Sequence, residues 1–289
     1  MAEIDAKARG ERPGALRFIT YLSPGIPLAF FEAVVDHARR DLGCRTSLRT
    51  ETRVSGPERG TEDPFSRDEV DVGFMCSPSF LWLRELRSPP VELLGVAPVF
   101  RDERNEGRPV YFCDVIVRRD SPIRSFVELR GGSWAYNDRC SLSGYYGLLQ
   151  KLADTGDDGR FFDRMLDSGS HLNSIEMVAR GEADAATIDS NVLAIRLRSD
   201  PKLRDRLRVI ESWGPFPVQP VVVRSGLHPD LNEELRAALL TVDSDSHTLL
   251  GFGLERFAPV TYDDYGPEAL ALEACESIPM PASLFSELS

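Results

Sequence analysis

Residues 133–152, SWAYNDRCSLSGYYGLLQKL, read as a short apolar strand, a loop rich in hydroxyl side chains, and a helix. The first backbone N–H groups of a helix have no partner within it, and the helix dipole favours a negative charge there. The loop that carries Ser141, Ser143 and Gly144 is therefore a candidate anion-binding site. The alternative is that one of the serines only caps the helix, as serines commonly do.

Upstream of this stretch, strand and helix patterns alternate. The apolar stripe of the first helix recurs with the i, i+3, i+4 spacing, and Gly43 is a plausible residue to end it. Such alternation predicts a mainly parallel sheet covered by helices. The predicted strands are 16–22, 45–51, 69–75 and a single buried strand at 91–100, and the predicted helices are 26–43 and 76–86.

The composition describes a folded protein and excludes several classes. Of the 289 residues, 42% are hydrophobic and 28% charged, and the net charge of -12 argues against a broad nucleic-acid interface. No apolar run reaches the ~18 residues that a membrane span needs. The five widely spaced cysteines form no metal-binding pattern, so we expect free thiols and neither metal nor cofactor. The polar N-terminus predicts a cytoplasmic protein, or a periplasmic one if a leader has been removed.

Two segments share one design: an acidic start, a strand of small residues, a polar residue, and then a helix. They are DEVDVGFMCSPSFLWL (68–83) and GEADAATIDSNVLAI (181–195). We interpret Ser77 and Asp189 as holding the same position, at the carboxyl end of a strand. Open α/β sheets bind ligands at that end, so both side chains are expected in a shared crevice. Asp189 is either a ligand carboxylate or a helix cap.

Two further residues have both a functional and a structural interpretation. His171 follows a Gly-Ser pair and precedes a helical pattern, so it is either a loop hydrogen-bonding residue or a ligand-binding group. Tyr111 begins a long apolar strand and either lines a pocket or packs in the core, as strand aromatics often do.

The ordered segments 70–83, 111–145, 168–193 and 210–227 resemble the phosphate/phosphite/phosphonate-binding proteins of ABC importers. The resemblance extends from about residue 16 to about residue 265. It is most specific in AYNDRCSLSGY (135–145) and in the segment from His171 to Asp189. It implies the type 2 periplasmic-binding-protein fold, in which two α/β lobes close on a ligand.

Two extended apolar stretches flank the second series of strands and helices and predict where the chain crosses between the lobes, and the resemblance implies the site. Residues 15–112 and 222–289 would form the first lobe and 113–221 the second, with crossings near 111–117 and 219–224. Ser141 and Ser143 would hold the oxygens of a small anionic ligand. An ABC permease would be the protein partner. The other positions that match the family's ligand-binding residues are Ser77, Tyr111, His171 and Asp189.

Leu142 is a departure from this family, which usually carries a third hydroxyl at that position. Loss of a hydroxyl would weaken the binding of a phosphonate, so we expect a ligand that is less charged or more apolar than a phosphonate. The main hypothesis is a small-molecule binding protein. The alternative is a cytoplasmic enzyme on the same fold that acts on a small anionic metabolite, with His171 and Asp189 as the acid–base pair.

Overall fold

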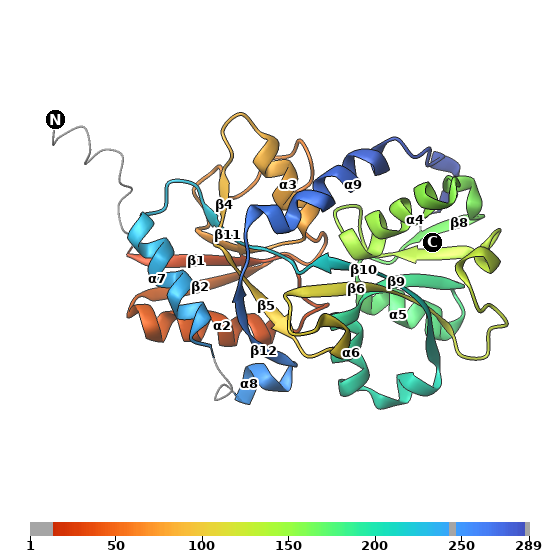
Figure 1. Cartoon of the computed structure of the whole chain (residues 1–289), viewed down its shortest axis with the longest axis horizontal. Helices are drawn as coiled ribbons and strands as arrows, with labels where there is room; N and C mark the ends of the chain where they lie inside the picture. The colour runs from red at the N-terminus through yellow and green to blue at the C-terminus, as the bar shows by residue number, and fades with distance from the viewer. Residues whose placement is uncertain (1–13, 243–246, 287–289) are drawn as a thin grey trace.

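The computed structural model describes residues 14–242 and 247–286, which form two α/β lobes joined at the middle of the molecule (Figure 1). The sheet of the first lobe has the strand order β2-β1-β3-β11-β4, and a two-stranded sheet, β12-β5, lies beside it. The strands of this lobe are β1 (Ala15–Thr20), β2 (Arg45–Thr50), β3 (Val72–Phe74), β4 (Val91–Leu93), β5 (Val96–Phe100), β11 (Val221–Arg224) and β12 (Leu254–Pro259).

The helices of the first lobe follow from apolar stripes in the sequence. In α2 (Leu28–Leu42) the stripe that includes Phe30, Val34 and Ala38 is buried, and the helix ends at Gly43, whose φ of 60° is left-handed. The structure confirms the strand predicted at 16–22, as β1, and the helix predicted at 26–43, as α2. The other helices with first-lobe residues are α3 (Ser77–Glu85), α7 (Pro229–Leu240), α8 (His247–Gly251) and α9 (Gly266–Glu276).

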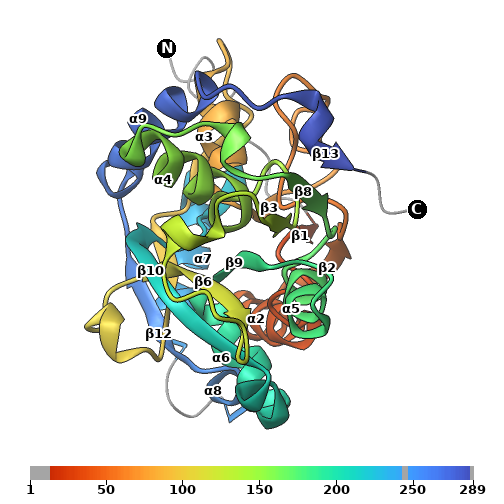
Figure 2. The same ribbon diagram turned by 90° about the vertical axis from the view of Figure 1, so that its right-hand side faces the viewer.

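The sheet of the second lobe has the order β10-β6-β9-β7-β8-β13. Figures 1 and 2 show α4 on one face of this sheet and α5 and α6 on the other. The strands are β6 (Val110–Arg118), β7 (Ser133–Tyr136), β8 (Arg164–Asp167), β9 (Ala185–Asp189), β10 (Leu207–Pro217) and β13 (Phe285–Ser286). The helices are α4 (Gly147–Thr155), α5 (His171–Arg180) and α6 (Ser190–Ser199). Short helical turns are η1 (Glu103–Asn105), η2 (Phe126–Leu129), η3 (Leu142–Tyr146), η4 (Gly159–Phe161), η5 (Pro201–Asp205), η6 (Tyr262–Tyr265) and η7 (Ala282–Leu284).

The chain crosses between the lobes earlier than the sequence predicts. The first crossing lies between the end of β5 and the start of β6, and the second between the end of β10 and the start of β11. The expected crossing at 111–117 lies within β6, because that segment pairs with both β10 and β9 in the second-lobe sheet. The boundary at 112/113 is therefore too late by a few residues.

The C-terminal segment does not stay in the first lobe, contrary to the assignment of 222–289. Helix α7 packs on α2 as expected, but α9 contacts both α3 and α4. Leu272 belongs to the core that includes the first lobe, whereas Cys275 and Leu284 belong to the core of the second. Strand β13 then pairs with β8. These apolar side chains complete the second-lobe core, which is why the chain crosses a third time.

The segment 91–100 forms two strands instead of the single strand that its apolar run suggests. Gly95, with a left-handed φ of 79°, separates β4 from β5. Strand β4 joins the main first-lobe sheet, and β5 pairs with β12. Neither β12 nor α8 was predicted.

Gly73, in the centre of β3, tests how tightly the first-lobe core is packed. A Cβ at this position would lie 2.5 Å from the Phe65 ring and 3.2 Å from Val222. We expect Gly73→Ala to lower the free energy of unfolding by about 1–3 kcal/mol, because both neighbours are buried. Gly266→Ala, where nothing lies within 4 Å, is the control. Urea unfolding curves that show equal stability for the two variants would contradict this packing.

Candidate functional site

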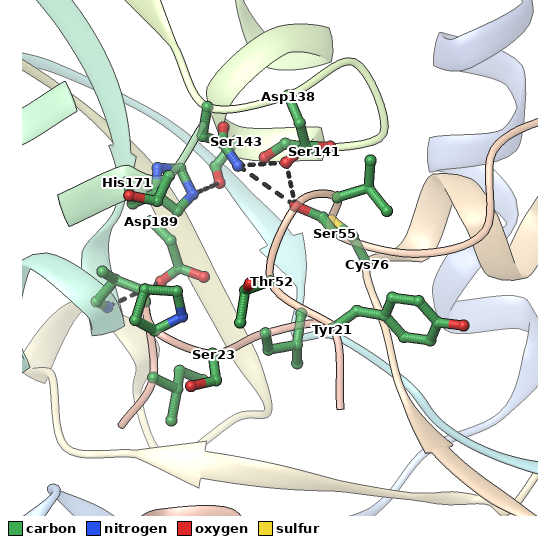
Figure 3. A pocket seen from close by; sticks show the side chains of 18 of the residues that line it. Tyr21, Ser23, Thr52, Ser55, Cys76, Asp138, Ser141, Ser143, His171 and Asp189 are labelled. Carbon is green, nitrogen blue, oxygen red and sulfur yellow. Dashed lines mark hydrogen bonds between the residues drawn. The ribbon is translucent and has the colours of Figure 1, made fainter. Parts of the chain in front are cut away.

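A polar cavity of about 40 Å³ lies between the two lobes (Figure 3). Its walls come from the loops that follow β1, β2 and β3 in the first lobe and β7, β8 and β9 in the second. The crevice at the carboxyl ends of the strands, expected from the alternating pattern, is therefore present. Polar residues and thiols that line it are Ser23, Thr52, Ser55, Cys76, Asn137, Asp138, Ser141, Ser143, Ser170, His171, Asp189 and Gln219.

The hydroxyl loop that follows β7 contributes two serines to the cavity. The Ser141 Oγ accepts a hydrogen bond from the Gly144 N–H at 3.1 Å, so Ser141 caps the turn η3 that leads into α4. It also lines the cavity, so capping and exposure to a ligand are compatible. The Ser143 hydroxyl lies 3.0 Å from His171 Nε2 (Figure 3).

His171 is the first residue of α5, and the Ser170 hydroxyl caps this helix. Burial lowers the pKa of His171 to about 4, so the ring is neutral near pH 7. Its Nδ1 atom is buried and has no hydrogen-bond partner among the described residues. A neutral imidazole can present one N–H donor and one acceptor, and its Nε2 is already beside a hydroxyl of the loop.

Asp189 ends β9 and caps α6. One of its oxygens accepts hydrogen bonds from the N–H groups of Asn191 and Val192, and the other accepts one from the Gln219 side chain at 2.6 Å. Desolvation raises the pKa of Asp189 to about 6, although these hydrogen bonds favour the charged form. The carboxylate is thus both a helix cap and a wall of the cavity.

Asp138 connects the two lobes and was not selected from the sequence. Its carboxylate accepts hydrogen bonds from Ser55 of the first lobe at 2.5 Å and from the Asn137 side chain and Cys140 N–H of its own loop. Burial raises the pKa of this carboxyl group. Asp138 lies within the quoted stretch 133–152, but Ser55 lies in a long loop without periodic pattern, so nothing in the sequence indicated this contact.

A second contact between the lobes joins the same loop to α3. The Leu142 N–H lies 3.2 Å from the Cys76 sulfur, and burial raises the pKa of this thiol well above its ordinary value. Cys76 is the N-cap of α3 just as Asp189 is the N-cap of α6. Cys76, rather than Ser77, therefore holds the position equivalent to Asp189.

Three of the predicted site residues do not line the cavity. The Ser77 side chain turns away from it and donates a hydrogen bond to Glu268 of α9. Tyr111 is fully buried in β6, and its hydroxyl has no partner among the described residues. Gly144 is in contact with Asn137, since a Cβ at this position would overlap that side chain, and its N–H is already bonded to Ser141. Ser141, Ser143, His171 and Asp189 do come together.

The described residues that line the cavity include neither Lys nor Arg. Neutral donors and two buried carboxyl groups therefore set its electrostatics. Within residues 14–242 and 247–286, no group of three or more His, Cys, Asp or Glu side chains is arranged to hold a metal ion. In the same part of the chain, no helix combines the length and apolarity of a membrane span. The geometry is that of a small polar binding site.

Two α/β lobes with a polar cavity at their interface are the architecture of the type 2 periplasmic-binding-protein fold. The sequence profile described as "ABC transporter, phosphonate, periplasmic substrate-binding protein" matches residues 29–265. The chain therefore belongs to this family of phosphonate-transporter substrate-binding proteins. This supports the binding-protein hypothesis over the enzyme alternative.

Several solved structures share the fold. A binding-protein component of an ABC phosphonate transporter from Pseudomonas aeruginosa is 19% identical, with a TM-score of 0.77 over 92% of this chain and 87% of that one. A Prochlorococcus marinus protein in complex with methylphosphonate is 16% identical, with a TM-score of 0.72 over 92% and 100%. A Xanthomonas citri protein bound to ATP is 20% identical, with a TM-score of 0.67 over 92% and 99%.

The raised pKa of Asp189 predicts a pH dependence of stability. Since this pKa rises from 3.8 to about 6 on folding, the native state holds the proton more tightly than the unfolded chain does. This group therefore lowers the free energy of unfolding between about pH 4 and pH 6, by on the order of 2 to 3 kcal/mol, and the loss persists above pH 6.

The matched variant is Asp189→Asn, whose side-chain oxygen can still cap α6 and whose amide can face a rotated Gln219 amide. Urea unfolding at pH 4.5 and pH 7.5 should show that the stability of the variant, relative to the wild type, increases with pH. An identical pH dependence for both proteins would mean that Asp189 is not desolvated in the folded state.

Proposed function

We propose that this protein binds a small phosphonate or a similar oxyanion in the cavity between its lobes. The observation that carries the proposal is the convergence of two helix starts on the cavity: Ser141 and Ser143 precede α4, and His171 begins α5. Hydroxyl and imidazole donors at such a position suit an oxyanion, because the helix dipole adds to their hydrogen bonds. The phosphonate family of the chain supports the same ligand class.

The size of the cavity supports a compact ligand. A volume of 40 Å³ corresponds to about three water-sized positions, since one water needs roughly 10–15 Å³ by this measure. A head group with a short substituent, such as methylphosphonate, is of the right order. The Prochlorococcus marinus relative was solved with that compound.

The charge of the cavity favours a singly charged ligand over a doubly charged one. The described lining residues include no cationic side chain that would balance the negative charge of the ligand. At position 142, where the family usually has a third hydroxyl, the Leu142 side chain is buried in the core. Asp189 accepts a hydrogen bond from a ligand O–H or N–H when ionised and donates one when protonated. We therefore infer a monoanionic oxyanion that carries a hydrogen-bond donor.

The family also supports a place in uptake. A substrate-binding protein of an ABC transporter passes its ligand to a permease, and the family is described as periplasmic. We propose the same partner and compartment for this protein.

The Ser143 hydroxyl provides the test of this function. Ser143→Ala should weaken methylphosphonate binding about 10- to 100-fold, because a hydrogen bond to a charged group contributes roughly 1.5–3 kcal/mol. The control is Ser174→Ala, which removes a buried hydroxyl bonded to Ser168 outside the cavity. Isothermal titration calorimetry measures both. Equal affinities for the two variants, or no binding by the wild type, would refute the proposal.

A further inference from the structure

A second and larger hollow, of about 610 Å³, lies at the hinge of the molecule. Both crossing segments contribute to it, through Arg108–Val110 and Trp213–Pro217. Its other walls are α4 of the second lobe, including Gly147, and α9, including Ala271. Figure 2 shows α4 and α9 together on the side of the molecule where β10 and β6 lie. Residues of both lobes therefore enclose this hinge hollow.

Strand β6 separates the hinge hollow from the polar cavity. A Cβ on Gly147, which lines the hollow, would lie 3.0 Å from the Cys113 sulfur of β6. Cys113 is in turn the register partner of Asp189, which lines the polar cavity. The crossing segments thus lie between the two spaces, and a rotation of the lobes about these segments would close one space and widen the other.

The walls of the hinge hollow favour an uncharged aromatic occupant. Trp213, Phe216 and five prolines are among the residues that line it. Several charged groups at its edge are already paired within the protein. Lys151 forms an ion pair with Glu211 at 3.1 Å, and Arg108 forms one with Glu106 at 3.2 Å. A charged ligand would have to compete with these contacts, whereas an aromatic ring would not.

Glu268 is a polar group of this wall that adds a preference. It is 4% exposed, one of its oxygens accepts a hydrogen bond from Ser77, and the other has no partner among the described residues. Burial raises its pKa to about 8, so the group is mostly protonated at pH 7. A neutral carboxyl group offers no negative charge to a cationic occupant, but it can donate or accept a hydrogen bond.

We propose that the hinge hollow is a second binding site, for a small uncharged aromatic molecule, whose occupation holds the lobes in the closed arrangement. A molecule in the hollow keeps its walls apart and so favours the state in which the polar cavity is closed. By linkage, the aromatic molecule and the oxyanion each raise the affinity for the other by the same factor. This coupling to the oxyanion rests on the proposed function, whereas occupation of the hollow and closure of the lobes do not.

The experiment uses 4-fluorobenzyl alcohol as the aromatic probe and a side chain as a permanent occupant. Ala271→Trp fills the hollow from α9, and Ala274→Trp, which is exposed on the same helix and does not line the hollow, is the control. Fluorine NMR line broadening should show probe binding to the wild type and to Ala274→Trp but not to Ala271→Trp. Small-angle X-ray scattering, without any anion, should give a smaller radius of gyration for Ala271→Trp than for the control.

In calorimetry, Ala271→Trp should bind methylphosphonate at least threefold more tightly than the control does. Gln150→Trp, which fills the hollow from α4, replaces Ala271→Trp if that variant does not fold. Probe binding that survives in the filled variant, no probe binding by the wild type, or an unchanged radius of gyration overturns the inference. If no variant binds methylphosphonate, the proposed function fails, but the NMR and scattering results still decide whether the hinge hollow is a site.

Discussion

The buried carboxyl group of Asp189 is the contact on which the site depends. It ends β9, caps α6, and holds Gln219, which belongs to the crossing segment that leads into the first lobe. The Asp189 side chain thus connects the end of β9, the start of α6 and the segment between β10 and β11 that crosses to the first lobe. Desolvation works against its charge, and three hydrogen bonds work in favour of it. A group held near this balance responds to any donor or charge that enters the cavity.

The remaining walls of the cavity follow the same rule: polar side chains fix the backbone and also face the ligand space. Ser141 caps a helical turn, and Asp138 ties its own loop to Ser55 of the opposite lobe. Because these contacts are made within the protein, part of the interface between the lobes is specified without a ligand. With no Lys or Arg on the described walls, recognition depends on oriented neutral donors, whose strength rises when water is excluded.

Local patterns in the sequence predicted the first strands and helices of the first lobe, and four of the selected residues, Ser141, Ser143, His171 and Asp189, line the cavity. The stripe of α2 and the hydroxyl loop with Ser141 and Ser143 depend on short-range physics, namely burial of one helix face and unpaired N–H groups at a helix start. The prediction for Ser77 was wrong by one residue. Cys76 is the N-cap of α3 and lines the cavity, whereas the next side chain, Ser77, points to Glu268. The third crossing by α9 and β13 depends on filling a distant core, which no local pattern records.

The central claim is that the cavity between the lobes is the oxyanion site, and a crystal structure of the protein with methylphosphonate tests it most directly. The account predicts phosphonate oxygens within hydrogen-bond distance of Ser141 Oγ, Ser143 Oγ and His171 Nε2, in the cavity that Asp189 also lines. Tyr111 and Ser77 should make no contact with the ligand. Methylphosphonate bound elsewhere on the protein, or oriented with its methyl group toward the two serines, would contradict the account.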